Sequence, residues 1–190
     1  MVRTIDWGQD KILESFVPKS DSWIPNLLQE FSDKQTKVRK SHKIGGRWEN
    51  LYLRVKDVPS VKVPMRYARD LAKRELETSS IILFEAIKQN PDSYPPFWFN
   101  IARNGEKTGL HDHARVCNLS AVTYLQACCD SGDLFFRRKG VNDLCIKPEV
   151  GKIVIFPPHL KHGVHSNQSS IDRISLAFNL FPFPLIHSEI

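Results

Sequence analysis

The sequence predicts a mainly β fold, in which helices near the amino terminus pack against antiparallel strands. From residue 97 onward, short segments rich in Val, Ile, Phe and Thr follow one another, separated by turns such as RNGE, DSGD and EVGK. No helix long enough to connect parallel neighbours lies between these segments, so we expect antiparallel pairing into a sandwich or small barrel. The predicted strands are FWFNIAR, LSAVTYLQ, DLFFRR, LCIKP, KIVIF and RISLAFNLF.

The amino-terminal 90 residues are predicted to form helices and loops. Residues 20–31 (SDSWIPNLLQEF) begin with candidate capping residues and place apolar side chains at helical spacing, which predicts an amphipathic helix. A second helix is predicted over residues 67–88, and its apolar end, IILFEAI, is expected to be well buried. The proline-rich segment QNPDSYPP (89–96) interrupts this pattern.

We expect one domain over residues 1–190, with 1–96 as a buttress of helices and loops and 97–181 as the β core. The buttress is also expected to form the mouth of a pocket. Within it, GGRWENLYL carries Trp48, Asn50 and Tyr52, which fit a pocket mouth and equally fit packing aromatics and a turn asparagine.

Composition and charge narrow the classes of function. The 190-residue chain is 41% hydrophobic and has no segment apolar enough to cross a bilayer and no signal-peptide pattern, so we expect a cytoplasmic protein without a membrane partner. Its four cysteines lack Cys-x-x-Cys spacing and are expected to be reduced. The basic clusters at 33–47 and 137–139 lack interleaved aromatics, so we expect solvated loops and no nucleic-acid partner. The net charge of +6 favours an anionic small molecule by long-range attraction; oligomeric state is not readable.

Strand alternation places scattered polar groups on one face of several strands. In RISLAFNLF, Arg173 and Ser175 lie on the face opposite the large apolar side chains. In FWFNIAR and LSAVTYLQ, Asn100 and Tyr124 lie on a face that also carries aromatic or aliphatic groups. This mixture fits the lining of a cavity at least as well as an outward polar face.

A second polar feature is GLHDHARVCN, where two histidines bracket an aspartate. The pattern fits a metal site, a base with its orienting partner, or a hydrogen-bonded part of the core. Because side chains two apart in an extended chain project to one side, His111 and His113 can form a chelate, whereas Asp112 points away.

A third histidine strengthens the metal interpretation. FPPHLKHGVHSN contains three histidines, of which His162 lies at a strand start and can complete the group, while His159 and His165 are expected to be loop residues. Three neutral nitrogens leave coordination positions open, as a catalytic metal requires.

Arg173 is the candidate anion-binding residue. An arginine on an inward strand face requires an anion, and its planar fork matches a carboxylate, with the Ser175 hydroxyl able to donate to the same oxygen. The alternative is a structural salt bridge with Asp172 or Glu149.

These motifs resemble a known family. FWFNIARNGEKTGLHDHARVCNLSAVTYLQ, SGDLFF, EVGKIVIFPPHLKHGV and DRISLAFNL, over about residues 97–181, resemble the iron(II)/2-oxoglutarate-dependent oxygenases of the small bacterial and phage type. The resemblance implies a double-stranded β-helix (jelly-roll, cupin-like) core and an oxidoreductase that uses Fe(II), 2-oxoglutarate and O2 to hydroxylate a small molecule, with release of succinate and CO2.

The resemblance also implies roles for particular residues. His111 and His162 would bind iron, Arg173 and Ser175 would hold the distal carboxylate of 2-oxoglutarate, and Tyr124 and Asn100 would make further contacts with co-substrate or substrate. No catalytic side chain beyond the metal centre is expected.

The chain departs from the broad superfamily at His113, where most members have Asp or Glu. His113 is then a third iron ligand, our preferred interpretation, or it supports the site from outside while water fills the vacant position. A third possibility is a cupin-type dioxygenase with three histidines that does not use 2-oxoglutarate. A non-enzymatic jelly-roll binding module is a further alternative.

Overall fold

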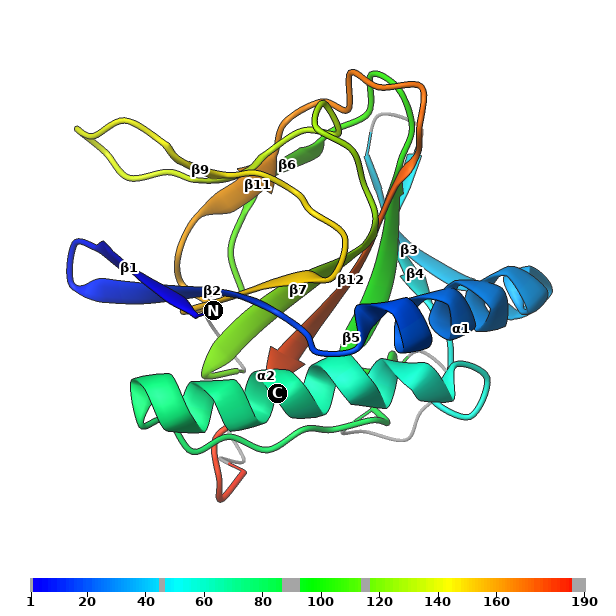
Figure 1. Cartoon of the computed structure of the whole chain (residues 1–190), viewed down its shortest axis with the longest axis horizontal. Helices are drawn as coiled ribbons and strands as arrows, with labels where there is room; N and C mark the ends of the chain where they lie inside the picture. Colours follow the sequence, from blue (N-terminus) through cyan, green and yellow to red (C-terminus); the bar gives the residue numbers. More distant parts are fainter. Residues whose placement is uncertain (1, 45–46, 87–92, 114–116, 186–190) are drawn as a thin grey trace.

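Two antiparallel sheets that face each other make up the β structure of this computed structural model, which describes residues 2–44, 47–86, 93–113 and 117–185 (Figure 1). The larger sheet has the strand order β1-β2-β10-β7-β12-β5-β4-β3, and the smaller has the order β6-β11-β8-β9. The larger sheet comprises β1 (Arg3–Trp7), β2 (Asp10–Phe16), β10 (Lys152–Phe156), β7 (Leu119–Gln126), β12 (Arg173–Leu180), β5 (Phe97–Ala102), β4 (Arg47–Tyr52) and β3 (Arg39–Ile44). The smaller sheet comprises β6 (Thr108–His111), β11 (His162–Val164), β8 (Leu134–Phe136) and β9 (Leu144–Ile146).

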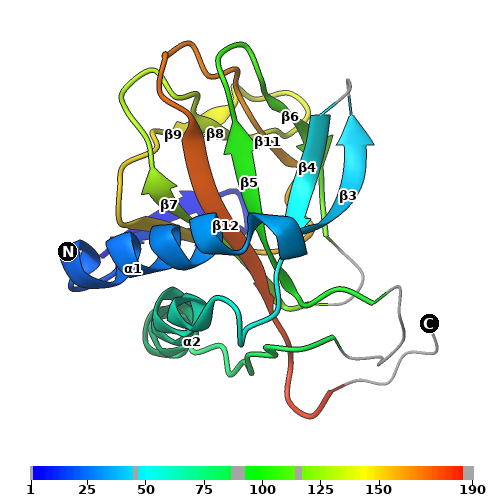
Figure 2. The same cartoon turned by 90° about the vertical axis from the view of Figure 1, so that its right-hand side faces the viewer.

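Two helices, α1 (Ser20–Asp33) and α2 (Lys62–Leu76), cover the outer face of the larger sheet (Figures 1 and 2). Short 3-10 turns follow α1 (Gln35–Lys37) and precede α2 (Pro59–Val61). The helices and the sheet share one apolar core, in which Phe31 of α1 stacks on Phe99 of β5 with ring centroids 4.3 Å apart. The predicted buttressing of antiparallel strands by amino-terminal helices is therefore confirmed. No helix within the described ranges is long and apolar enough to cross a membrane.

The predicted second helix is wrong at both limits. The helix α2 begins at Lys62 and ends at Leu76, where Glu77 adopts a left-handed backbone conformation with φ of 53°. The apolar segment after it is extended: Ile81 exchanges two backbone hydrogen bonds with Phe181, and Ile81 to Phe84 are only half-buried. The end of the predicted helix at residues 87–88, and the start of the proline-rich segment at 89–92, lie outside the described residues.

The expectation that residues before 90 form only helices and loops is also wrong. Two hairpins, β1–β2 and β3–β4, extend the larger sheet at its two edges. The β3–β4 hairpin pairs with β5 through Leu51 and Phe99, and this pairing brings residues of the amino-terminal half to the cavity described below. Gly45 and Gly46, between its strands, lie outside the described residues.

Strand alternation is confirmed on the central strands. Leu176, Phe178 and Leu180 of β12 belong to the core under the helices. Arg173 and Ser175 of the same strand line the space between the two sheets. The inner face of the larger sheet therefore supplies the polar groups of the cavity, while its outer face supplies the helix-packing core.

Candidate metal centre and its cavity

Three histidines converge between the two sheets. His111 ends β6, His162 begins β11, and antiparallel pairing places these two residues directly opposite each other. His113 follows two residues after His111, and its backbone N–H donates to the Pro158 carbonyl at 2.8 Å. Each of the three side chains offers one nitrogen, and these atoms lie within 4.8 Å of one another. The structure thus brings together the three histidines that the sequence analysis singled out.

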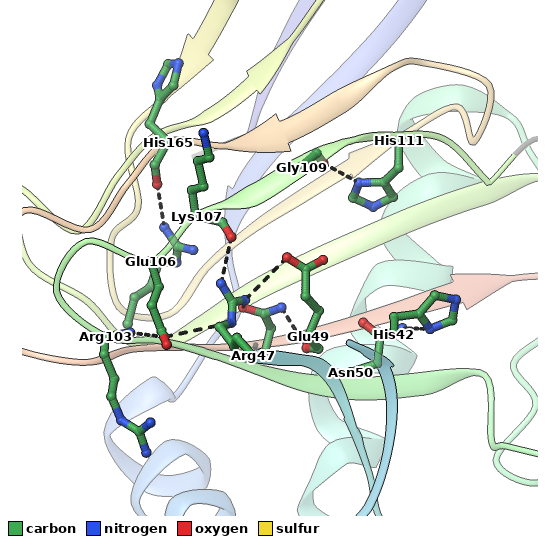
Figure 3. Close-up of polar contacts among 12 residues, drawn as sticks. His42, Arg47, Glu49, Asn50, Arg103, Glu106, Lys107, Gly109, His111 and His165 are labelled. Atoms are coloured by element: carbon green, nitrogen blue, oxygen red, sulfur yellow. Dashed lines mark hydrogen bonds and ion pairs between the residues drawn. The ribbon is translucent and has the colours of Figure 1, made fainter. Parts of the chain in front are cut away.

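Backbone carbonyls fix the orientation of two of these rings. The Nδ1 of His111 donates to the Gly109 carbonyl at 2.8 Å (Figure 3). The Nδ1 of His162 donates to the Leu160 carbonyl, also at 2.8 Å. A neutral imidazole that donates through Nδ1 keeps the lone pair on Nε2, which is the atom that binds a metal. The two rings are therefore held in the tautomer of a ligand.

Burial keeps two of the three histidines, His113 and His162, neutral at ordinary pH. Burial, with a smaller contribution from His111, lowers the pKa of His162 to about 3 and that of His113 to about 4. The ring of His113 also lies against Trp98, with centroids 5.7 Å apart. Neutral nitrogens at ordinary pH suit metal coordination.

The two remaining histidines of this segment lie outside the group, as expected. His159 is exposed and its Nε2 lies 3.1 Å from a carboxylate oxygen of Asp10. His165 is exposed and stacks on the Phe135 ring at 4.6 Å. Neither contributes to the three-histidine group.

Arg173 is almost fully buried, with 1% of its surface exposed, and lines the same cavity. Its Nη1 donates to the carbonyls of Ser131, Gly132 and His165 at 2.6, 3.2 and 3.4 Å. Burial lowers its pKa to about 10, so the guanidinium stays charged at neutral pH. Within the described part of the chain no carboxylate lies within 4 Å of it.

The salt bridge considered as an alternative for Arg173 is therefore not present. Glu149 pairs instead with Lys152 at 2.6 Å, and Asp172 forms no ion pair among the described residues. A buried cation without a counter-ion is costly, so the guanidinium is suited to receive an anion from the cavity.

A glycine shapes the turn that holds this arginine. Gly132 has φ of +87°, and a Cβ on it would collide with the carbonyl of His165. Because L side chains rarely adopt that conformation, glycine is required for the close approach of the carbonyls that surround the guanidinium.

The other predicted co-substrate residues form a row across three neighbouring strands. Ser175 of β12 is paired with Asn100 of β5 on one side and with Tyr124 of β7 on the other. The Tyr124 hydroxyl is buried and has no hydrogen-bond partner in the described structure. Burial raises the pKa of Tyr124 well above its ordinary value, so its hydroxyl remains a neutral donor.

Asn100 lines the cavity but is engaged by the β3–β4 hairpin. Its Nδ2 donates to the Glu49 carbonyl at 2.8 Å, and its Oδ1 accepts from Arg47 at 2.9 Å. Arg47 also donates to the Lys107 carbonyl at 2.7 Å and lies 3.8 Å from Glu106 (Figure 3). Asn100 thus holds the Glu49 backbone and the Arg47 side chain of the hairpin, and its contact with a co-substrate stays a prediction.

The cavity has a volume of about 440 Å³, within the range of roughly 300–1,000 Å³ typical of small-molecule sites. It extends from the three histidines to Arg173 and is bounded by side chains of both sheets and of the β3–β4 hairpin. Its lining includes His42, Glu49, Asn50, Tyr52, Trp98, Asn100, His111, Asp112, His113, Val122, Tyr124, Phe156, His162, Arg173 and Ser175. The interpretation of the polar strand faces as a cavity lining is confirmed.

Comparison with known proteins adds sequence and fold evidence. Residues 137–179 match the model of a family described as "Putative 2OG-Fe(II) oxygenase", and no curated protein matches the chain. The matched segment contains His162, Arg173 and Ser175 but not His111 or His113. This part of the chain is similar to that family.

Solved structures of such oxygenases share the fold. The non-heme alpha-ketoglutarate-dependent epimerase SnoN from nogalamycin biosynthesis superposes with a TM-score of 0.69 at 13% identity, covering 92% of this chain and 77% of SnoN. The carbocyclase SnoK from the same biosynthesis gives 0.66 at 9% identity, covering 90% and 79%. A Pseudomonas putida prolyl-4-hydroxylase gives 0.62 at 14% identity, covering 90% and 92%. The resemblance and the double-stranded β-helix fold are confirmed, and the three-histidine group fits the iron of these oxidoreductases.

One cavity residue, Glu49, and its neighbour Arg47 were missed by the sequence analysis. Both residues lie on β4, which was assigned to a loop. Glu49 lines the cavity, and the guanidinium of Arg47 lies 4.0 Å from the Glu49 carboxylate without lining the cavity itself. The aromatic residues Trp48 and Tyr52, which have high strand propensity, are the weak signal that could have identified this strand. Asn50 and Tyr52 line the cavity as one of the two interpretations expected, whereas Trp48 does not.

Proposed function

We propose that this protein is an Fe(II)- and 2-oxoglutarate-dependent oxygenase that hydroxylates a C–H bond of a small molecule. His111, His113 and His162 are the proposed metal ligands, and Arg173 with Ser175 and Tyr124 binds the distal carboxylate of 2-oxoglutarate. The observation that supports this most directly is one cavity with three converging imidazoles and a buried arginine that has no carboxylate partner among the described residues.

The donor set fits iron(II). Nitrogen ligands of borderline softness suit iron, and three of them leave positions open for further ligands. Because no carboxylate is among the three, the site adds no negative charge to a divalent metal. This charge balance favours a dianionic co-substrate such as 2-oxoglutarate.

The opposite end of the cavity suits the distal carboxylate. Arg173 lines the same cavity as Ser175 on the same strand and Tyr124 on the neighbouring strand. A carboxylate placed there would accept charge-assisted hydrogen bonds and give the buried Tyr124 hydroxyl a partner.

Bound iron(II) and 2-oxoglutarate supply the oxidising chemistry, in which O2 is consumed and succinate and CO2 are released. The chain itself binds and orients. Gly109 and Leu160 carbonyls orient the His111 and His162 rings, Arg173 sets the direction of the co-substrate, and Trp98 packs on His113. Apolar side chains such as Val122 and Phe156 limit water in the cavity.

The presence of His113 where many oxygenases have a carboxylate favours a second candidate. A three-histidine dioxygenase that does not use 2-oxoglutarate would need the same three ligands and would not need Arg173. The two candidates therefore differ in what replacement of Arg173 does.

The test is an anaerobic titration of metal-free protein with iron(II) and 2-oxoglutarate, following the visible charge-transfer band of the chelate. We expect a band in the wild type, a weakened band in Arg173→Ala, and a lost or shifted band in His113→Ala. Arg103→Ala and His165→Ala, which change exposed residues outside the cavity, are matched controls and should leave the band unchanged.

The absence of a band despite stoichiometric iron would refute the use of 2-oxoglutarate and favour the three-histidine dioxygenase. Failure of the protein to bind iron at all would favour a binding module. A band of unchanged intensity and position in His113→Ala would show that His113 is not a ligand.

A further inference from the structure

Glu49 places a carboxylate in the wall of the cavity without satisfying it. The residue is 7% exposed, and its carboxylate forms no hydrogen bond within the described residues. Its nearest cation is Arg47, at 4.0 Å, which is longer than a hydrogen bond. In Figure 3 the Glu49 side chain extends from its strand toward the side where Gly109 and His111 lie.

Arg47 does not neutralise this carboxylate, because other groups engage its guanidinium. Its two terminal nitrogens donate to the Lys107 carbonyl and to Asn100, and Glu106 lies 3.8 Å from its Nε. The single positive charge of Arg47 is therefore shared by the carboxylates of Glu49 and Glu106, which leaves one formal negative charge on these three side chains. Asp112, exposed and also lining the cavity, adds a second anionic side chain.

Aromatic rings line the same cavity. Tyr52 of β4 and Trp98 of β5 both face it, with centroids 6.3 Å apart. The negative faces of such rings attract a cation placed within about 6 Å of them. The cavity thus contains a carboxylate that has no hydrogen-bonding partner among the described residues, together with two aromatic rings, and both kinds of group attract an ammonium group.

We propose that Glu49 is a specificity-determining residue that binds a cationic ammonium group of the substrate in the cavity that Tyr52 and Trp98 also line. This inference rests on the proposed oxygenase function in calling the ligand a substrate. It replaces the anionic substrate favoured by the net charge of +6, because that charge lies largely on exposed residues whereas Glu49 lies in the cavity. Arg173 then takes the anionic co-substrate and Glu49 the cationic substrate, so the two ligands are sorted by charge.

The test compares two probes of equal chain length, hexylammonium and hexanol, by ligand-detected NMR titration of the metal-free full-length protein. We expect the wild type to bind hexylammonium about 10- to 100-fold more tightly, the amount expected for a hydrogen bond to a charged group. Glu49→Gln keeps the shape and removes the charge, and should abolish this preference. Glu106→Gln removes the other carboxylate beside Arg47, outside the cavity, and should retain it.

Equal affinity of the wild type for the two probes would overturn the proposal without any variant. A preference that survives in Glu49→Gln, or that is lost equally in Glu106→Gln, would also overturn it. The iron(II)–2-oxoglutarate band, measured on the same proteins, reports separately on the proposed function. A Glu49-dependent preference without a band would support the cation site and refute the oxygenase. A band without the preference would support the oxygenase and refute the cation site.

Discussion

Removing one oxygen atom from Tyr124 should raise stability and lower co-substrate affinity at the same time. Tyr124 is 2% exposed and packs in the apolar cluster between the sheets, but its hydroxyl has no hydrogen-bond partner in the described structure. A buried polar group without a partner costs about 1–3 kcal/mol. Phenylalanine keeps the ring and omits this cost, so we expect Tyr124→Phe to stabilise the ligand-free protein by about 1 kcal/mol.

Tyr67 provides a matched control for this substitution. Its hydroxyl lies 2.8 Å from the hydroxyl of Ser15, which is itself 2% exposed. Tyr67→Phe therefore breaks a bond and leaves Ser15 without that partner, so it should destabilise the protein by about 1 kcal/mol. In a domain of this size each change corresponds to a shift in melting temperature of roughly 2–4 °C, upward for Tyr124→Phe and downward for Tyr67→Phe.

The assays are thermal unfolding of the metal-free protein and titration of the iron(II) protein with 2-oxoglutarate. If Tyr124 donates to the distal carboxylate, Tyr124→Phe should weaken 2-oxoglutarate binding about 5- to 10-fold, the loss of one hydrogen bond. A lowered melting temperature in Tyr124→Phe would show that the hydroxyl has a partner in the protein. A raised melting temperature with unchanged affinity would refute the placement of Tyr124 at the carboxylate.

Three further substitutions test the packing that supports the site, each by urea unfolding. Gly132→Ala should lower the free energy of unfolding by more than about 2 kcal/mol, because it combines a positive φ with a collision. Gly105→Ala is also at positive φ but has open space around it, so it should lower that free energy by only about 1 kcal/mol. Equal costs would refute the role given to the His165 carbonyl. Phe99→Ala should cost about 3–5 kcal/mol, because the ring is fully buried against Phe31. A cost below about 1 kcal/mol would contradict the shared core of helices and sheet.

The sequence could predict features that depend on local periodicity. Alternation along RISLAFNLF separates Arg173 and Ser175 from Leu176 and Phe178, and the structure keeps that separation. The spacing of His111 and His113 predicts a pair on one side, and both reach the same group. These features follow from the geometry of one strand, which the order of residues determines.

The limits of helices and the edges of the sheet were less accessible to sequence reasoning. The end of α2 depends on the backbone conformation of Glu77 and on pairing of Ile81 with a strand end 100 residues away in the chain. The hairpin β3–β4 is polar and short, so its strand character comes from pairing with β5 more than from its composition.

The sequence by itself determined the antiparallel β class and the polar faces of the central strands, and it singled out three histidines and an arginine as candidates for the chemistry. Only the tertiary structure decided that the Gly109 and Leu160 carbonyls orient two of the imidazoles, that Arg173 has no carboxylate partner among the described residues, and that Glu49 faces the same cavity. The physical reason is that periodicity depends on neighbours in the chain. Burial, pairing of charges and hydrogen-bond partners depend on neighbours in space, which strands far apart in the sequence supply.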